Sequence, residues 1–270
     1  MPEMIKVGVV AYDPKVVTIW EGLKSYFTAR DIGMDFVLFS NYDAQVNALL
    51  EGWIDIAWNT NLAYVKVHRR TNGQCGVLAM RDVDVGFTSK LIAGAGRGIR
   101  SPRDLKGKRV ALGTYDSVQA GILPLYFLKQ IGVDPAKDIT IIRFDLDVGK
   151  HGDTGTSEVE VLKAVSAGEA DAGAIGDQYW ARALTENLVD STNVLAVWTS
   201  PEYCHCNFTI RDKEDEQRFA GWTDALLAMD YNKPAERRIL DMEGLKRWVR
   251  PQLDGYRVVF DAVDELKASR

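Results

Sequence analysis

The first part of the chain alternates short apolar runs with amphipathic segments. Runs 5–10, 34–40 and 54–59 are almost continuously apolar and rich in β-branched residues, which is typical of strands covered on both faces. The segments between them, 14–29 and 42–53, repeat their apolar residues at helical spacing. Strands that alternate with helices predict a parallel sheet with helices on both faces.

The same alternation returns after residue 89 and predicts a second α/β unit. The expected strands are 90–94, 108–113, 138–144, 170–176 and 193–198. One expected helix begins at Ser117, and two more cover 157–168 and 179–188. The sequence therefore predicts two α/β units in tandem.

From about Cys204 the chain offers one more strand, 206–211, and then helical segments at 215–229, 234–249 and 261–269. A helical tail cannot cover its own apolar faces, so we expect it to pack on the first unit. This predicts a discontinuous first lobe, 1–88 plus 204–270, and a second lobe, 89–203. Short crossings near 82–90 and 198–206 would let the two lobes hinge around a cleft.

Composition and charge narrow the classes of partner. A chain of 270 residues with 46% hydrophobic residues is large enough for two domains. The net charge of -5 and the lack of any basic stripe argue against a nucleic-acid partner. No apolar stretch approaches the ~20 residues that cross a bilayer, so no membrane span is expected.

The first residues of the chain indicate in which cell compartment the protein is expected. The segment MPEMIKVGVVAYD lacks the cationic start, apolar stretch and cleavage site of a signal peptide. This predicts a cytoplasmic protein. If an export signal precedes the given sequence, the alternative is a periplasmic or lipid-anchored protein.

Three cysteines, Cys75, Cys204 and Cys206, do not make a disulfide framework, and reduced thiols are expected. The run Cys204-His205-Cys206 could bind a soft metal, but it lacks the usual zinc spacing, so no metal site is expected. In an extended strand the two cysteines would share one face and His205 would face away. A Cys nucleophile activated by His205 is the alternative if this segment borders the cleft.

Four stretches together resemble a known family. They are EGWIDIAWNTNLAYV, SPRDLKGKRVALGTYDSVQAG, SEVEVLKAVSAGEADAGAIGDQYW and VLAVWTSPEYCHCNFTIR. In this order they resemble the phosphonate/phosphite/phosphate-binding component of ABC transporters, a branch of the type II periplasmic binding proteins. The resemblance implies two lobes, each a mostly parallel sheet flanked by helices, that close on a small polar ligand. It also implies an ABC permease as partner and no cofactor.

Two function classes are compatible with this resemblance. The first is a solute-binding protein, and the second is a cytoplasmic enzyme or ligand sensor on the same bilobal fold. No Ser/His/Asp arrangement, P-loop, GxGxxG or HExxH motif supports a particular reaction, and no catalytic residue is assigned. The transporter-type motifs favour solute binding over catalysis.

Polar residues at the ends of strands are the first candidates for ligand contact. In such folds a ligand meets side chains and helix N-termini at the carboxyl ends of the strands. The candidates of this kind are Tyr12, Asn59, Thr60 and Asn61 in the first lobe, and Asp177 and Tyr179 in the second. Asn and Thr at such turns are also ordinary helix caps. Trp58 lies inside an apolar run and is expected in the core.

The turn Gly113–Gln119 departs from the family. Relatives carry a Ser-Thr-Ser-Gly run there, whose hydroxyl and backbone N–H groups bind an anionic oxyacid. This chain has Asp116, Ser117 and Gln119 instead, and the carboxylate would repel a phosphonate. The alternative is that Asp116 caps the following helix and leaves Ser117 and Gln119 to reach the ligand.

A second departure lies at the start of the segment TSEVEVLKAV. The resemblance places an anion-contacting His of the relatives near Glu158, with Thr156 and Ser157 just before it. Acidic residues at both places suit a ligand with an amine, a zwitterion or a neutral polar molecule better than a simple oxyanion. The alternative is that Glu158 is a solvated acid in the first turn of a helix.

Overall fold

The computed structural model describes residues 4–268 and divides into two compact units. The first unit combines the chain up to Gly86 with Cys204–Tyr256. The second combines Phe87–Tyr203 with the chain from Arg257 onward. This two-unit α/β architecture confirms the predicted fold class.

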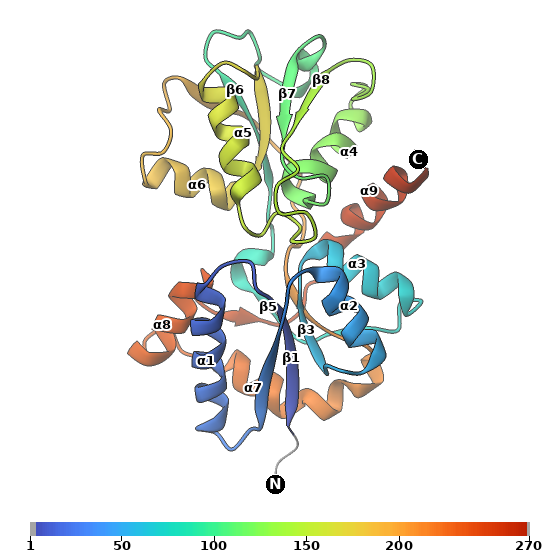
Figure 1. Cartoon of the computed structure of the whole chain (residues 1–270), viewed down its shortest axis with the longest axis vertical. Helices are drawn as coiled ribbons and strands as arrows, with labels where there is room; N and C mark the ends of the chain where they lie inside the picture. The colour runs from blue at the N-terminus through green and yellow to red at the C-terminus, as the bar shows by residue number, and fades with distance from the viewer. Residues whose placement is uncertain (1–3, 269–270) are drawn as a thin grey trace. The chain divides into compact units, whose positions relative to one another are not determined.

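The first unit is built on a five-stranded sheet in the order β2-β1-β3-β11-β4. Its strands are β1 (Ile5–Val10), β2 (Met34–Phe39), β3 (Ile56–Asn59), β4 (Gly76–Val77) and β11 (Asn207–Ile210). Figure 1 labels β1 and β3 of this sheet. β1 runs parallel to both β2 and β3, whereas β11 is antiparallel to its neighbours. A separate two-stranded sheet pairs β5 (Met80–Arg81) with β12 (Trp248–Val249).

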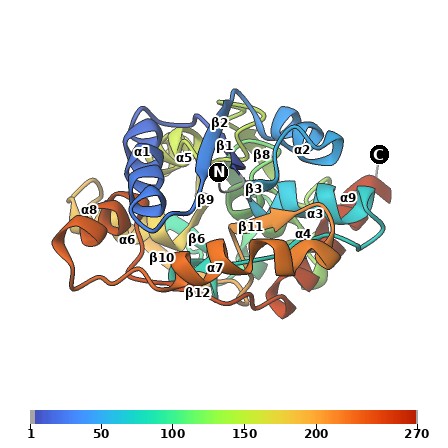
Figure 2. The ribbon, with the colours of Figure 1, turned by 90° about the horizontal axis from the view of Figure 1, so that it is seen from below.

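Helices cover both faces of this sheet, as Figure 2 shows for α1 and α2 on either side of β1. One face carries α1 (Lys15–Thr28), α7 (Ala220–Leu227) and α8 (Pro234–Glu243), and the other carries α2 (Tyr42–Glu51) and α3 (Asn61–Arg70). Val7 and Val9 of β1 belong to the core beneath α1, as alternation along a strand requires. Between them, Gly8 leaves room for α2 and the segment that follows it, because a Cβ there would lie 3.2 Å from Gln45 Cγ and 2.3 Å from Ile54 Cδ1. Trp58 lies in the same core, which confirms its predicted role.

The second unit has its own five-stranded sheet in the order β10-β6-β9-β7-β8. The strands are β6 (Ser89–Gly94), β7 (Arg109–Leu112), β8 (Thr140–Arg143), β9 (Ala172–Gly176) and β10 (Val194–Thr199). β7 is parallel to β8 and β9, and β6 is antiparallel to β9 and β10. Both sheets are therefore mixed. The antiparallel strands β6 and β11 are the first strands after the chain enters their unit from the other one.

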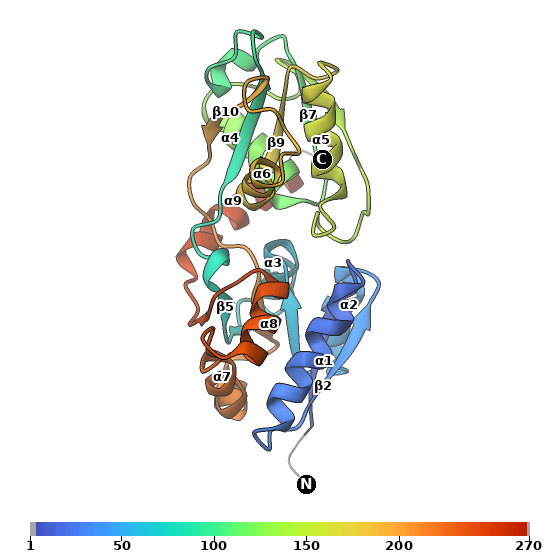
Figure 3. The same cartoon turned by 90° about the vertical axis from the view of Figure 1, so that its left-hand side faces the viewer.

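In the second unit α5 (Thr156–Ser166) and α6 (Asp177–Thr185) cover one face of the sheet, and α4 (Leu123–Gln130) covers the other (Figure 3). Short turns of 3-10 or π helix complete the described chain: η1 (Asp82–Asp84), η2 (Pro102–Leu105), η3 (Val118–Ile122), η4 (Lys213–Phe219) and η5 (Asp254–Tyr256). Within residues 4–268 no helix is both long and apolar enough to cross a bilayer.

The helical tail differs from its prediction. The last helix, α9 (Arg257–Ala268), packs on α4 and η3 of the second unit, whereas the sequence analysis placed 204–270 as a whole in the first lobe. Its buried Val259 and Ala262 lie on the covered face, and Lys129 Nζ of α4 lies 3.1 Å from Glu265 Oε1. The predicted helix 234–249 also ends early, at Glu243, where Gly244 adopts φ +80°.

Candidate ligand-binding site

The first unit places two predicted residues at one edge of its sheet. β1 and β3 are parallel neighbours, so Tyr12, which follows β1, and Asn59, which ends β3, lie at the same edge. The amide oxygen of Asn59 accepts a hydrogen bond from Gln45 Nε2 at 2.9 Å. Its amide nitrogen is buried and has no hydrogen-bond partner among the described residues. Asn59 therefore offers a donor that the unit itself does not use.

The side chains of Thr60 and Asn61 form hydrogen bonds within the first unit. Thr60 is the N-cap of α3, and its hydroxyl accepts from Ala63 N at 3.2 Å. Asn61 accepts from Leu62 N at 2.9 Å and donates through Nδ2 to Cys204 O at 3.3 Å. Both side chains are thus engaged in shaping the strand-to-helix turn, and their contact with a ligand stays a prediction.

A residue that the sequence analysis did not select lies beside Asn59. Asn207 opens β11 and pairs with Asn59 across the antiparallel β3–β11 ladder. Its Nδ2 donates to Tyr256 Oη at 2.8 Å, and that hydroxyl donates to His205 O at 2.9 Å. Burial raises the pKa of Tyr256 well above its usual value, so the phenol stays protonated. The signal in the sequence was an Asn at the head of an apolar strand.

In the second unit, the turn after β7 contains Asp116, for which a ligand contact and a helix cap were the two predicted roles. Ser117, not Asp116, is the N-cap of η3, and its Oγ accepts from Ala120 N at 3.2 Å. Asp116 instead accepts from Thr114 Oγ1 at 2.8 Å and from Gly149 N at 2.6 Å. The cap interpretation of Asp116 is therefore wrong. Its carboxylate ties the β7 turn to the loop that leads into α5.

We expect Asp116→Ala to loosen this loop. The change leaves the Thr114 hydroxyl and the Gly149 N–H without their acceptor, and hydrogen bonds to a charged group are worth about 1.5–3 kcal/mol. Hydrogen exchange of the Gly149 amide should accelerate relative to amides in β9. Unchanged exchange at Gly149 would show that the carboxylate does not hold the loop.

The beginning of α5 brings Ser157 and Glu158 into the interior, whereas Thr156 is exposed. Glu158 is 5% exposed, and its Oε1 accepts from Gly176 N at 2.5 Å. The alternative of a solvated first-turn acid is therefore wrong. Ser157 Oγ is buried next to Gly113, where an added Cβ would lie 3.0 Å away, and it has no partner among the described residues.

Asp177 and Tyr179 at the start of α6 have different environments. Asp177 Oδ2 accepts from Thr88 N at 3.1 Å and from Thr88 Oγ1 at 2.9 Å. Its Oδ1 is buried and has no partner among residues 4–268. Tyr179 belongs to the core beneath α6, and Arg182 lies over its ring at 5.1 Å. Asp177 thus keeps an unused acceptor.

Ser117 and Gln119 lie side by side next to Gly152. A Cβ at that glycine would lie 2.6 Å from Ser117 Oγ and 3.0 Å from Gln119 Nε2. The main-chain oxygen of Gln119 accepts from Ser89 Oγ at 2.7 Å. That hydroxyl is also 2.9 Å from Tyr203 Oη, so the strand β6 fixes the position of this turn.

Arg143 is a cation that the sequence analysis missed. It ends β8, the parallel neighbour of β7, and its Nη1 donates to Gly113 O at 3.3 Å. Burial lowers the pKa of this guanidinium, whereas Asp145 raises it. An Arg at the end of a predicted strand was the available signal.

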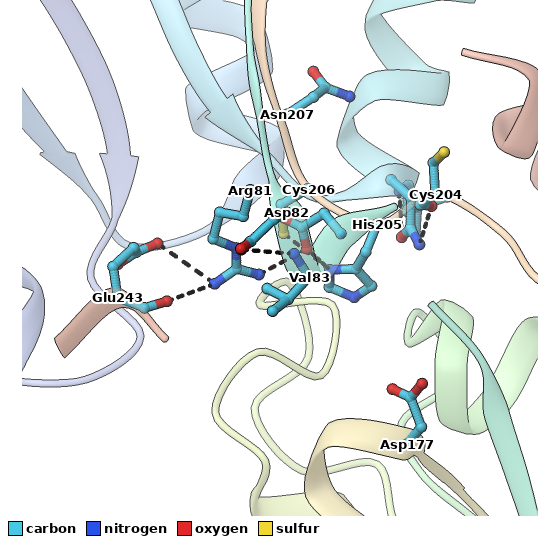
Figure 4. Close-up of polar contacts among 12 residues, drawn as sticks. Arg81, Asp82, Val83, Asp177, Cys204, His205, Cys206, Asn207 and Glu243 are labelled. Atoms are coloured by element: carbon cyan, nitrogen blue, oxygen red, sulfur yellow. Dashed lines mark hydrogen bonds and ion pairs between the residues drawn. The ribbon is translucent and has the colours of Figure 1, made fainter. Parts of the chain in front are cut away.

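The Cys204-His205-Cys206 segment does not alternate as predicted (Figure 4). His205 Nδ1 lies 3.0 Å from Cys206 Sγ, while the Cys204 thiol donates to Gln252 O at 3.0 Å. The strand β11 begins only at Asn207, so strand geometry does not apply to the three preceding residues. Burial raises the pKa of Cys204 to about 11, which makes it a poor nucleophile.

Comparison with known proteins gives one consistent result. Residues 7–256 match the family model described as ABC transporter, phosphonate, periplasmic substrate-binding protein. The chain is also 26% identical over 237 residues to the probable ABC transporter phosphite binding protein PhnD1 of Prochlorococcus marinus. That alignment covers 84% of this chain and 76% of the relative.

Solved structures share the fold. PhnD1 of Prochlorococcus marinus in complex with methylphosphonate superposes with a TM-score of 0.73 at 22% identity, covering 99% of both chains. XAC2383 of Xanthomonas citri, bound to ATP, has a TM-score of 0.72 at 15% identity and covers 98% of both chains. The sulphonate-binding protein SsuA of Escherichia coli has a TM-score of 0.63 at 16% identity, covering all of this chain and 93% of SsuA.

These findings correct one expectation. The prediction of a cytoplasmic protein is wrong, because the matched family is periplasmic, and the findings point to the periplasm. They support solute binding and do not favour the alternative of an enzyme or sensor.

Proposed function

Since the chain belongs to the family of periplasmic substrate-binding proteins of phosphonate ABC transporters, we propose that it binds a small phosphonate that carries an amino group. A protein of this family binds a small ligand, and the partner that receives this ligand is proposed to be an ABC permease. The observation that carries the proposal is a pair of buried polar atoms of the second unit, Ser157 Oγ and Asp177 Oδ1, which have no hydrogen-bond partner among residues 4–268.

The hydroxyl of Ser157 suits the oxyanion of a phosphonate. A serine hydroxyl carries a hydrogen that it can donate to an anionic oxygen. A buried donor without an acceptor costs about 1–3 kcal/mol, so a ligand oxygen that accepts from it gains that energy. Ser157 also lies in the first turn of α5, where the helix dipole and free N–H groups favour an anion.

The second atom, Asp177 Oδ1, suits an ammonium group. Asp177 Oδ1 can only accept while its carboxylate is ionised, and Thr88 occupies the other oxygen. Asp116 already uses both of its oxygens, for Thr114 Oγ1 and for Gly149 N, and Glu158 uses Oε1 for Gly176 N. Of these three carboxylates, only Asp177 has a buried oxygen without a partner among the described residues. We therefore assign the amine of the ligand to Asp177.

Titration calorimetry with two phosphonates tests the proposal. We expect 2-aminoethylphosphonate to bind about tenfold or more tightly than methylphosphonate, since a hydrogen bond between charged groups is worth about 1.5–3 kcal/mol. Asp177→Asn should remove this preference while leaving methylphosphonate affinity nearly unchanged. Phosphate and phosphite serve as further ligands without an amine.

Asp171→Asn is the matched control. Asp171 stands at the opposite end of β9, where it accepts from Arg109 Nη2 at 3.0 Å, and its loss should not alter ligand preference. Equal affinity of the wild type for both phosphonates would refute the assignment of the amine. Absence of binding to every phosphorus oxyanion tested would refute the phosphonate class itself.

A further inference from the structure

Three buried side chains of the first unit gather their metal-binding atoms in one place. Asp84 ends η1, while His205 and Cys206 directly precede β11, 121 and 122 positions further along the chain. The exposed fractions of Asp84, His205 and Cys206 are 0%, 5% and 3%. A carboxylate oxygen, an imidazole nitrogen and a thiol sulfur from these residues all lie within 4.8 Å of one another. The ligand-binding residues discussed above do not include this cluster.

We propose that Asp84, His205 and Cys206 form a binding site for a zinc-class divalent cation. Carboxylate oxygen, imidazole nitrogen and thiolate sulfur are all ligands of Zn²⁺, at about 2.0–2.3 Å. Around a tetrahedral ion these bond lengths place ligand atoms about 3.3–3.7 Å apart. His205 Nδ1 lies 3.6 Å from Asp84 Oδ1 and 3.0 Å from Cys206 Sγ, so both distances from the imidazole are close to those that an ion requires.

The neighbouring Arg81 orients the carboxylate of Asp84 and leaves one of its lone pairs for an ion. Arg81 Nε lies 2.6 Å from Asp84 Oδ2, and Nη2 lies 2.8 Å from Oδ1. Each carboxylate oxygen has a second lone pair, so Oδ1 can still face the imidazole. Metal-binding carboxylates are commonly held by such hydrogen bonds from the surrounding shell.

The local charge favours a divalent cation. Arg81 also approaches Glu243, with Nη1 3.6 Å from Oε1, as Figure 4 shows. The single positive charge of Arg81 therefore faces the two negative charges of Asp84 and Glu243, so these three side chains carry a formal net charge of minus one. Binding through Cys206 requires loss of its thiol proton to solvent, which adds another negative charge. A divalent ion brings the buried cluster to neutrality, whereas an anion would increase the imbalance.

Sequence spacing could not reveal this site. Cys204-His205-Cys206 lacks the usual zinc pattern, and the third ligand comes from Asp84 in a distant part of the chain. The structure also separates the two cysteines, since the Cys204 thiol is directed to Gln252 O. With three protein ligands, the fourth position of a tetrahedral ion remains for water.

Metal titration of the reduced, chelator-treated protein tests the proposal without any solute present. We expect the wild type to bind one equivalent of Zn²⁺, and Co²⁺ in its place to show the near-ultraviolet absorption of a cobalt–thiolate bond. Cys206→Ser should lose the band and weaken Zn²⁺ binding more than about 100-fold, because even changes outside the ligand set cost 10–100-fold. Cys204→Ser is the matched control and should keep both properties.

His205→Gln provides a second variant if Cys206→Ser fails to fold, which circular dichroism would report. It should likewise lose tight binding while keeping all three thiols. A wild type that binds no stoichiometric Zn²⁺, or a Cys206→Ser variant that binds it as tightly as the wild type, would overturn the site. Because the titration contains no phosphonate, its result is independent of the proposed solute.

Discussion

Replacing Arg81 by Met is expected to lower the free energy of unfolding by about 3–5 kcal/mol, the usual cost of removing one partner from a buried ion pair. Arg81 has a side chain only 13% exposed, and Asp84 is fully buried. Without the guanidinium, the carboxylates of Asp84 and Glu243 would remain inside the protein with no cation between them. Equilibrium urea unfolding in the presence of a chelator would measure the loss.

The pKa values of this pair agree with that expectation. Burial opposes the charge on Asp84, but the charge and hydrogen bonds of Arg81 outweigh it and hold the pKa of Asp84 at about 2. The pKa of Arg81 lies well above its usual value, since Asp84 outweighs the cost of burial. Both groups are therefore charged at neutral pH, and each depends on the other.

A matched surface variant separates the ion pair from the loss of an arginine as such. Arg250 pairs with Asp224 at 3.5 Å, but the two side chains are 75% and 69% exposed. Exposed pairs are worth roughly 0–1 kcal/mol, so Arg250→Met should change stability by less than that. Equal losses for Arg81→Met and Arg250→Met would contradict the importance of the buried network.

The order of strands and helices was predictable because apolar periodicity is a local signal. The run 5–10 is a strand, the run 170–176 contains the strand β9, and the segment 157–168 contains most of the helix α5. The position of α9 was not predictable, since its amphipathic pattern shows that one face is covered but not by which unit. The antiparallel direction of β6 and β11 follows from the path of the chain between units and leaves no local mark.

The candidate residues show a similar limit. The sequence analysis looked for polar residues at the ends of predicted strands. It correctly placed Asn59 and Asp177 at the carboxyl ends of parallel strands. It could not show that Asp116 would bond to Gly149, 33 positions away, and so lose its expected capping role to Ser117. Likewise, the juxtaposition of Asp84 with His205 depends on pairing between distant segments.

Replacing Trp222 by Ala is expected to cost about 3–5 kcal/mol, the range for removing a large aromatic side chain from a core. Trp222 lies on α7 and is 2% exposed. Its ring stacks on Phe27 at 5.2 Å and meets the edge of Phe208 at 5.0 Å. The change would therefore open a cavity where α1, α7 and the sheet meet, and urea unfolding would report its cost.

Two further variants distinguish this cavity from other consequences of losing a tryptophan. The indole N–H of Trp222 is buried without a hydrogen-bond partner among the described residues, so Trp222→Phe keeps most of the packing and removes an unsatisfied donor. It should cost much less than Trp222→Ala. Trp53 is 68% exposed, and Trp53→Ala should change stability by roughly 0.5 kcal/mol or less. If Trp53→Ala proved as harmful as Trp222→Ala, the packing of α7 on the sheet would not be what stabilises this unit.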